Sequence, residues 1–107
     1  GMGVQPWEEF DQTVSWDSLL TGWGWKKCSS SGDVTYWTRP GKDSDISASL
    51  GFQCEGTIPL LFVFTTNADP LPPWKYYKPS DAYAWVHHRG DFKSSNRELR
   101  DKGYGKS

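Results

Sequence analysis

Two short segments of this chain place aromatic rings beside cations, a pattern suited to single-stranded nucleic acid. Trp37, Arg39 and Lys42 cluster around a Pro-Gly turn, and residues 74–78 (Trp-Lys-Tyr-Tyr-Lys) interleave rings with lysines. Exposed rings can stack on bases while neighbouring cations meet phosphates. The alternative is that the rings pack in the core and the cations are solvated. The candidate nucleic-acid-binding residues are therefore Trp37, Arg39, Lys42, Lys75 and Lys78.

The sequence contains fragments of catalytic motifs, but none of these motifs is complete. The terminal Gly-Lys-Ser at 105–107 lacks the upstream glycine that a phosphate-binding P-loop requires. Asp43 and Asp45 lie in a polar turn without the third carboxylate expected of a two-metal site. Of the adjacent His87 and His88, one is expected to end a helix and the other to pack. We therefore predict no catalytic residue and no cofactor, so that the chain is not an enzyme by itself.

The cysteine and histidine content does not suggest a metal centre. Cys28 and Cys54 are the only cysteines, neither lies in a Cys-x-x-Cys pair, and the two histidines are adjacent. Structural zinc sites take four such ligands, usually in closely spaced pairs. We therefore expect no bound metal and two reduced thiols, as in a cytoplasmic protein.

Length and composition indicate one domain with an aromatic core. The chain has 107 residues, of which 36% are hydrophobic and 16% aromatic, including 7 Trp. Large rings bury much area each, so they can offset a low apolar content.

No apolar run reaches the roughly 18 residues of a membrane span, which predicts a cytoplasmic protein with no membrane contact. Gly1 before Met2 looks like a tag-cleavage scar. The predicted division is 1–14, scar and N-terminal arm, and 15–107, one domain.

The charge is nearly balanced, with a formal net value of −1 at pH 7. This argues against strong capture of nucleic acid by the whole surface. Residues 1–64 carry four basic against eight acidic side chains, whereas residues 65–107 carry eight basic against five acidic ones. A polyanion contact should therefore favour the C-terminal part and the turn at 39–42.

The patterning predicts an α+β fold. Ser15 is expected to cap a helix that ends at Gly22, with residues 2–14 extending it or forming an arm. Strand patterns follow at residues 24–28, 34–38 and 46–50, and 60–66 is expected to be the central strand. Ser80 and Asp91 are expected to cap helices over 81–88 and 92–102 after a proline-rich loop. The expected architecture is a small antiparallel sheet of about four strands with one N-terminal helix and two C-terminal helices.

We expect the C-terminal helices to cover the central strand. In this interpretation Trp85 and Leu99 anchor them on the sheet face that carries Phe62 and Phe64, and Tyr104 packs back on the sheet.

Three segments in a fixed order carry a family resemblance. They are 36–42 (Tyr-Trp-Thr-Arg-Pro-Gly-Lys) with the serines of 47–49, then 61–66 (Leu-Phe-Val-Phe-Thr-Thr), and 82–92, which continues to Gly103-Tyr104-Gly105. Over about residues 15–105 the chain resembles a domain of phage and actinobacterial mobile-element replication proteins. There the domain accompanies a primase-polymerase module or a helicase-type ATPase.

The chain also resembles the zinc-binding domain of DnaG-type bacterial primases, a zinc-ribbon type. Residues 37–42 take the place of that family's first ligand turn, and 62–66 take the place of its second ligand strand. Every ligand cysteine is missing there, so the resemblance implies a zinc-free relative with aromatic packing in the place of the metal.

The resemblance and the residues together suggest a non-catalytic accessory domain of a phage or mobile-element primase/helicase protein that contacts single-stranded DNA weakly. Other domains of that protein are further expected partners. The alternative is a protein-interaction or spacer module without nucleic-acid binding. A carbohydrate-binding domain would use Trp platforms too, but it is normally all-β and secreted, and the two C-terminal helices speak against it.

Overall fold

The computed structural model describes residues 3–105 of the chain, and their fold is α+β, as predicted. Within that range there are four helices: α1 (Pro6–Thr13), α2 (Trp16–Gly22), α3 (Pro79–His88) and α4 (Phe92–Asp101). The strands are β1 (Lys26–Ser31), β2 (Val34–Thr38), β3 (Ala48–Glu55), β4 (Ile58–Val63) and β5 (Tyr76–Tyr77). The expected tag scar at Gly1 and Met2 lies outside the described residues. In the described part, no helix has the length and apolar character needed to cross a membrane.

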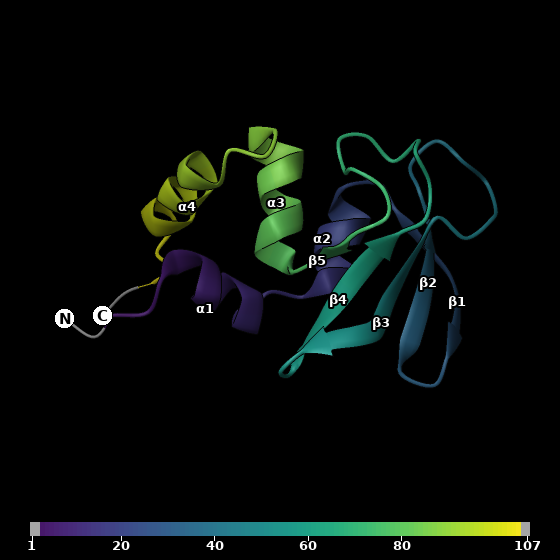
Figure 1. Cartoon of the computed structure of the whole chain (residues 1–107), viewed down its shortest axis with the longest axis horizontal. Coiled ribbons are helices and arrows are strands. Elements are labelled where there is room, and N and C mark those ends of the chain that lie inside the picture. The colour runs from purple at the N-terminus through teal and green to yellow at the C-terminus, as the bar shows by residue number, and fades with distance from the viewer. Residues whose placement is uncertain (1–2, 106–107) are drawn as a thin grey trace.

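The sheet is an antiparallel meander in which each strand pairs with the next one in sequence, in the order β1-β2-β3-β4-β5 (Figure 1). About four strands were expected, and the additional one is β5. Its two residues, Tyr76 and Tyr77, pair with Phe62 and Leu61 inside the segment expected to be loop. A strand of two residues has no visible alternation in the sequence, so only its pairing with β4 identifies it.

The third strand runs past the predicted range of 46–50 because a bulge continues it to Glu55. Its pairing with β4 shifts register between Leu50 and Cys54. Gly51 lies at the start of this irregularity with a φ of 96°, and a Cβ there would lie 2.8 Å from the Asp33 carbonyl oxygen. A side chain at this position would be strained and would clash, so glycine is required.

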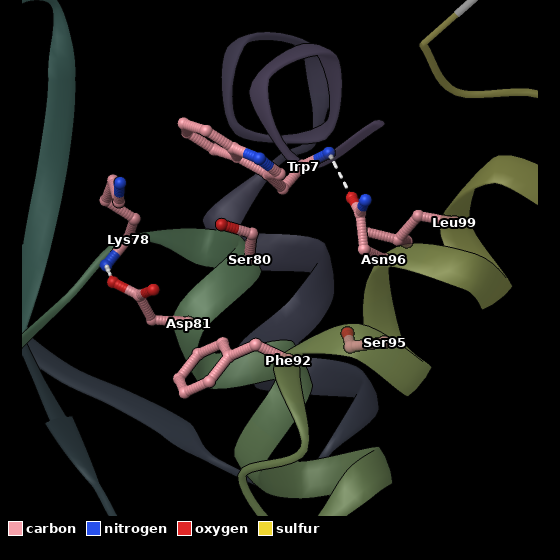
Figure 2. A pocket seen from close by; sticks show the side chains of 8 residues that line it. All are labelled: Trp7, Lys78, Ser80, Asp81, Phe92, Ser95, Asn96 and Leu99. Carbon is pink, nitrogen blue, oxygen red and sulfur yellow. Dashed lines mark hydrogen bonds between the residues drawn. The ribbon is translucent and has the colours of Figure 1, made fainter. Parts of the chain in front are cut away.

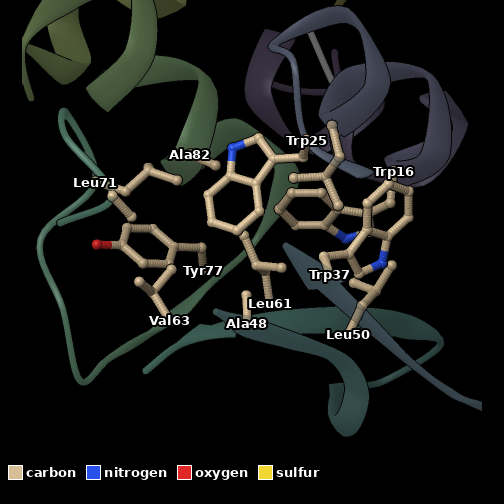
Figure 3. Close-up of a cluster of buried hydrophobic side chains, with 12 residues drawn as sticks. Trp16, Trp25, Trp37, Ala48, Leu50, Leu61, Val63, Leu71, Tyr77 and Ala82 are labelled. Carbon is tan, nitrogen blue, oxygen red and sulfur yellow. The ribbon is translucent and has the colours of Figure 1, made fainter. Parts of the chain in front are cut away.

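Helices α2 and α3 cover one face of the sheet and close the main core (Figures 1 and 3). Trp16 and Leu20 of α2 and Ala82 of α3 pack against a sheet surface that includes Trp37 and Leu61. The other buried members of this cluster are Trp25, Ala48, Leu50, Val63, Ala68, Leu71 and Tyr77. The large rings therefore make up for the low apolar content of the chain.

A second apolar cluster joins α1 to the two C-terminal helices. The buried Phe10 ring meets the rings of Tyr83 and Tyr104 edge-on, with centroids 5.1 and 5.2 Å away, and Leu99 completes the cluster. The N-terminal arm is thus a separate helix that docks through Phe10, and it does not extend α2. Tyr104 packs on α1, whereas the sequence interpretation placed it on the sheet.

The helix caps are partly as expected. Ser15 and Asp91 accept hydrogen bonds from the backbone N–H groups of Ser18 and Ser94 at 3.2 and 3.1 Å. The prediction for Ser80 is wrong, since α3 begins at Pro79 with Lys78 as its N-cap residue. Proline at the first helical position is favourable because its missing N–H is not needed there.

Ser80 instead binds a buried carboxylate that ties α1 to α3. Asp11, 5% exposed, accepts the Ser80 backbone N–H at 2.6 Å and the Ser80 hydroxyl at 2.9 Å. Desolvation raises the pKa of Asp11 above its usual value, although the two hydrogen bonds from Ser80 act in the opposite sense. The sequence gives no sign of this link across 69 residues.

The expected packing of the C-terminal helices on Phe62 and Phe64 is wrong. Leu61 and Val63 of β4 face the core, so the alternate positions Phe62 and Phe64 lie on the opposite face of the sheet. Leu99 packs in the second cluster, and Trp85 packs partly buried against the main core. The segment from Ile58 to Phe64 is apolar at every position, so its pattern does not reveal which side faces the helices.

The central role of Trp37 can be tested by truncation. Trp37 is 1% exposed, and replacing a buried Trp by Ala typically costs about 3–5 kcal/mol. We expect Trp37→Ala to lower the free energy of unfolding by about that amount in denaturant titrations. The matched control is Trp74→Ala, because Trp74 is 62% exposed and its loss should change stability by less than about 1 kcal/mol. Equal effects of the two substitutions would contradict the assignment of the core.

The buried link between α1 and α3 makes a second prediction. Asp11→Ala leaves the Ser80 N–H and hydroxyl without their acceptor, which should cost about 1–3 kcal/mol. A double-mutant cycle with Ser80→Ala, followed by chemical denaturation, should show that the two substitutions are not additive. Additive effects would mean that the hydrogen bond between the Ser80 hydroxyl and the Asp11 carboxylate contributes nothing to stability.

Candidate binding face of the sheet

The face of the sheet opposite the main core carries a row of aromatic side chains. Tyr36 pairs with Ser49, Ser49 with Phe62, and Phe62 with Tyr76. Directly paired residues of antiparallel strands point to the same face. These four side chains from β2, β3, β4 and β5 therefore form one line across the sheet, with the small Ser49 between two rings.

Phe62 is the centre of this arrangement. Its ring centroid lies 4.6 Å from that of Tyr76, 5.3 Å from Phe64 and 6.5 Å from Trp74. The Trp74 backbone N–H donates to the Val63 carbonyl oxygen at 2.8 Å, and its φ of 63° turns the chain here. The rings meet edge-on or tilted, which is a favourable geometry for aromatic pairs. The cluster is thus a preformed surface.

Much of this surface is open to solvent. Phe52 and Trp74 are 65% and 62% exposed, and Tyr76 and Phe64 are 41% and 37% exposed. A hollow of about 270 Å³ is lined by Tyr36, Ser49, Phe52, Phe62, Phe64 and Tyr76. We call the rings of this surface, Tyr36, Phe52, Phe62, Phe64, Trp74 and Tyr76, the aromatic face. Contiguous exposed apolar patches of this kind usually mark interaction sites.

The structure does not support the expected stacking role of Trp37. Its ring belongs to the main core at 1% exposure, and its indole N–H donates to the Thr35 hydroxyl at 3.0 Å. A base cannot stack on a buried ring, so this expectation is corrected. The neighbouring Tyr36 points to the other face of the sheet because strand side chains alternate.

Of the four expected cations, Arg39 and Lys42 lie in the β2–β3 connection. That connection meets the end of β4 through the hydrogen bond from the Phe64 N–H to the Ser47 carbonyl oxygen at 2.8 Å. Arg39 donates to the Pro40 carbonyl oxygen at 3.4 Å, and Lys42 pairs with Asp45 at 3.2 Å. These two cations therefore lie at the Phe64 end of the aromatic face.

The other two cations are elsewhere. The Lys75 ammonium lies 5.3 and 5.5 Å from the ring centroids of Tyr77 and Trp85, on the helix side of the sheet. The Lys78 ammonium lies at the end of β3, 3.5 Å from the Glu55 carboxylate and 4.6 Å from the Trp7 ring centroid. The five predicted residues thus do not form one site.

Sequence reasoning missed most of the aromatic face. The sequence interpretation places Phe62 and Phe64 under the C-terminal helices, and Phe52 is not among the predicted site residues. The signal that pointed to it is the uninterrupted apolar character of 58–64. A strand that is apolar on both sides is either covered on both faces or exposes one for binding. Trp74 and Tyr76 stand out in the sequence as loop aromatics, but the predicted site residues there are the neighbouring Lys75 and Lys78.

A cluster of titratable side chains links α3 to α4, away from the aromatic face. The Glu98 carboxylate accepts from the Tyr83 hydroxyl at 2.7 Å, lies 2.5 Å from His88 Nε2 and pairs with Lys102 at 3.1 Å. The hydrogen bond from Tyr83, followed by those from His88 and Lys102, lowers the pKa of Glu98 to about 2. Burial raises the pKa of Tyr83.

The adjacent His87 also has a perturbed pKa. Burial lowers it below its usual value, and the Trp23 indole N–H donates to His87 Nε2 at 3.0 Å. This nitrogen accepts only when the imidazole is neutral. The cluster therefore holds a carboxylate and a neutral imidazole in place at neutral pH.

No group of three or more His, Cys, Asp or Glu residues in the range 3–105 is arranged to hold a metal ion. Cys28 on β1 and Cys54 on β3 are both exposed and not disulfide-bonded.

In comparisons with known proteins, the chain matches no protein-family model, no curated protein and no solved structure. The resemblance to the zinc-binding domain of primases therefore stays a prediction from the sequence.

The low pKa of Glu98 makes a prediction about acid stability. A carboxylate whose pKa falls on folding stabilises the folded state above its unfolded pKa, and this contribution is lost as the pH falls through the folded pKa. For Glu98 the window runs from about 4.5 to about 2. In urea titrations at several pH values, wild type should therefore lose stability relative to Glu98→Gln across this window.

A comparison with the variant and one further measurement make this test specific. Asp11 has a raised pKa and contributes with the opposite sign, so the difference between wild type and the variant is the quantity to compare. Carbon-detected NMR titration of Glu98 should show its pKa rising in Tyr83→Phe, because the largest cause of the shift is removed. An unchanged pKa in that variant would contradict the assigned cause.

Proposed function

We propose that this chain is a non-catalytic, cytoplasmic accessory domain that binds single-stranded nucleic acid weakly by stacking bases on the aromatic face. The observation that carries the proposal is the cluster around Phe62, where rings from three strands and a loop form an exposed, preformed surface. The resemblance in the sequence is the reason to look for its ligand among nucleic acids, within a phage or mobile-element primase/helicase protein.

Stacking is the contact that this surface is best suited to make. Trp74 and Tyr76 are exposed and adjoin Phe62 at one edge of the hollow. Each base–ring stack contributes about 1–3 kcal/mol and tolerates any base, because every base has an aromatic face. A domain that stacks two or three bases would therefore bind without strict sequence preference.

Phosphate contacts would be few. Arg39 and Lys42 lie at the Phe64 end of the aromatic face, and Arg39 has no ion-pair partner within residues 3–105. Lys42 forms an ion pair with the exposed Asp45, and solvent strongly screens this pair, so the lysine remains accessible to a phosphate. With a net charge of −1, the affinity at physiological salt should be that of non-specific contacts, about 10⁻⁴–10⁻⁶ M.

The absence of catalysis in this proposal rests on the α3–α4 cluster, where several titratable groups with shifted pKa values lie together. General acid–base catalysis works best with a group that titrates near the operating pH. Glu98 with a pKa of about 2 is a weak base, and Tyr83 with a raised pKa remains protonated at pH 7. Both are engaged with each other, so the cluster supports a structural role.

A protein-interaction module is the second candidate function, and one observation favours it. None of the six residues that line the hollow of the aromatic face carries a charge. Protein interfaces are enriched in Tyr, Trp and Phe and depleted of charge at their centre. A partner chain, such as another domain of the same replication protein, would then cover the rings.

Fluorescence anisotropy of labelled oligothymidylate separates the two candidates. We expect saturable binding at low salt and a loss of about 5- to 150-fold for Trp74→Ala, which corresponds to one stacked base. Arg39→Ala should instead reduce the magnitude of the log–log salt slope by about 0.7, because one phosphate contact is lost. The matched control is Val4→Ala, since Val4 is an apolar side chain that is 46% exposed and lies outside the aromatic face; its affinity should equal that of wild type.

Two outcomes would overturn the proposal. One is no binding by wild type even at low salt, which would favour the protein-interaction function. The other is equal affinity for wild type and Trp74→Ala, which would show that the aromatic face takes no part in binding.

A further inference from the structure

A second hollow, which we call the helix pocket, lies between α1, α3 and α4 and shares no residue with the aromatic face (Figure 2). Its volume is about 200 Å³. Trp7 of α1 and Phe92 of α4 line it on opposite sides and are 39% and 50% exposed. Two aromatic side chains that face a shared gap offer flat apolar surfaces to a ligand. Leu99 adds a buried apolar side chain to the lining.

The pocket also contains a buried hydroxyl group without a partner. Ser95 is 3% exposed, and its Oγ makes no hydrogen bond to any residue in the range 3–105. Buried polar atoms are nearly always hydrogen-bonded in folded proteins. An orphaned hydroxyl group in the lining of a pocket therefore indicates a place where a polar ligand atom would be accepted.

Two neighbouring side chains add polar groups with fixed roles. Asn96 Oδ1 accepts the Trp7 backbone N–H at 3.1 Å, so the NH₂ of this amide is left as a donor. Asp81 Oδ2 accepts the Lys78 backbone N–H at 3.1 Å, which leaves the other carboxylate oxygen as an acceptor. The pocket thus combines donors and an acceptor with ring-shaped apolar walls.

The charges around the pocket favour an uncharged ligand. Lys78 lies 4.6 Å from the Trp7 ring centroid and also pairs with Glu55 at 3.5 Å. Asp81 stands on the same helix end with the opposite charge. Opposite charges at one site cancel most of the field that would attract an ion.

We propose that the helix pocket binds a single nucleobase, flat between Trp7 and Phe92, with its polar edge toward Ser95 and Asn96. The volume is below the roughly 300–1,000 Å³ of sites for drug-sized ligands and suits one ring system. Nucleobase edges carry hydrogen-bond donors and acceptors together, whereas a Tyr or Trp side chain has one polar group. The helix pocket shares no residue with the aromatic face, so nucleobase binding in the pocket is tested independently of the proposed function.

The test is an NMR titration of the ¹⁵N-labelled chain with adenosine, guanosine, cytidine and uridine, which carry no charge. At least one nucleoside should cause saturable shifts of the Trp7 indole signal, identified in Trp7→Phe, and of the Asn96 side-chain amide. We expect Ser95→Ala to weaken that binding by about two- to tenfold, as for one lost hydrogen bond. Trp7→Ala should weaken it by roughly fivefold or more through lost stacking.

Stability provides a readout that a purely structural role of Ser95 would not produce. Ser95→Ala removes a buried hydroxyl without a partner and places a better helix former in α4. The melting temperature should therefore stay equal or rise while nucleoside affinity falls. The matched control is Ser94→Ala on the same helix, outside the pocket, which should leave nucleoside affinity unchanged.

The source of the base is distinguished by a second titration with a short single-stranded oligonucleotide. Pocket shifts that weaken in Ser95→Ala but persist in Trp74→Ala would mean that the pocket takes a base of a strand independently of the aromatic face. Shifts with nucleosides only would assign the pocket to a free nucleoside.

No shifts with any nucleoside would overturn the proposal, as would equal affinity in Ser95→Ala and wild type. Tighter binding of N-acetyltyrosine amide than of every nucleoside would overturn it in favour of a partner's side chain.

Discussion

Side chains on a β-strand alternate between the two faces of the sheet, and here that constraint decides both the core and the candidate site. Strand β4 is apolar at every position, so closing one of its faces with α2 and α3 leaves Phe62 on the other. Nothing in residues 3–105 covers that second face fully, and the rings around Phe62 stay accessible. The aromatic face is therefore a direct consequence of how the main core is packed.

Helix α3 joins the two halves of the molecule. One side of it contributes Ala82 to the main core, while Tyr83 belongs to the second cluster with Phe10 and Leu99. Its first turn is held to α1 by the buried carboxylate of Asp11. Because three helices meet around this turn without filling all the space, the helix pocket forms at their junction.

Electrostatics has a modest role in the surface that we assign to binding. Part of the positive charge faces acids or rings within the chain: Lys27 pairs with Asp17, Lys102 with Glu98, and Lys75 lies over Trp85. A cation engaged in this way is less available to a phosphate. Recognition by this protein should therefore depend on rings and shape, with only a small dependence on salt.

The sequence by itself determined the fold class, two of the helix caps, most strand positions and the aromatic nature of the core, because these follow from local patterns of residues 15–105. It did not determine which face of β4 would be covered, since an apolar strand has no polar side to mark the outside. That choice placed Trp37 inside and Phe62 outside. The pairing of β5, the Asp11–Ser80 link and the pocket at Ser95 likewise depend on residues far apart in the chain, so only tertiary packing could decide them.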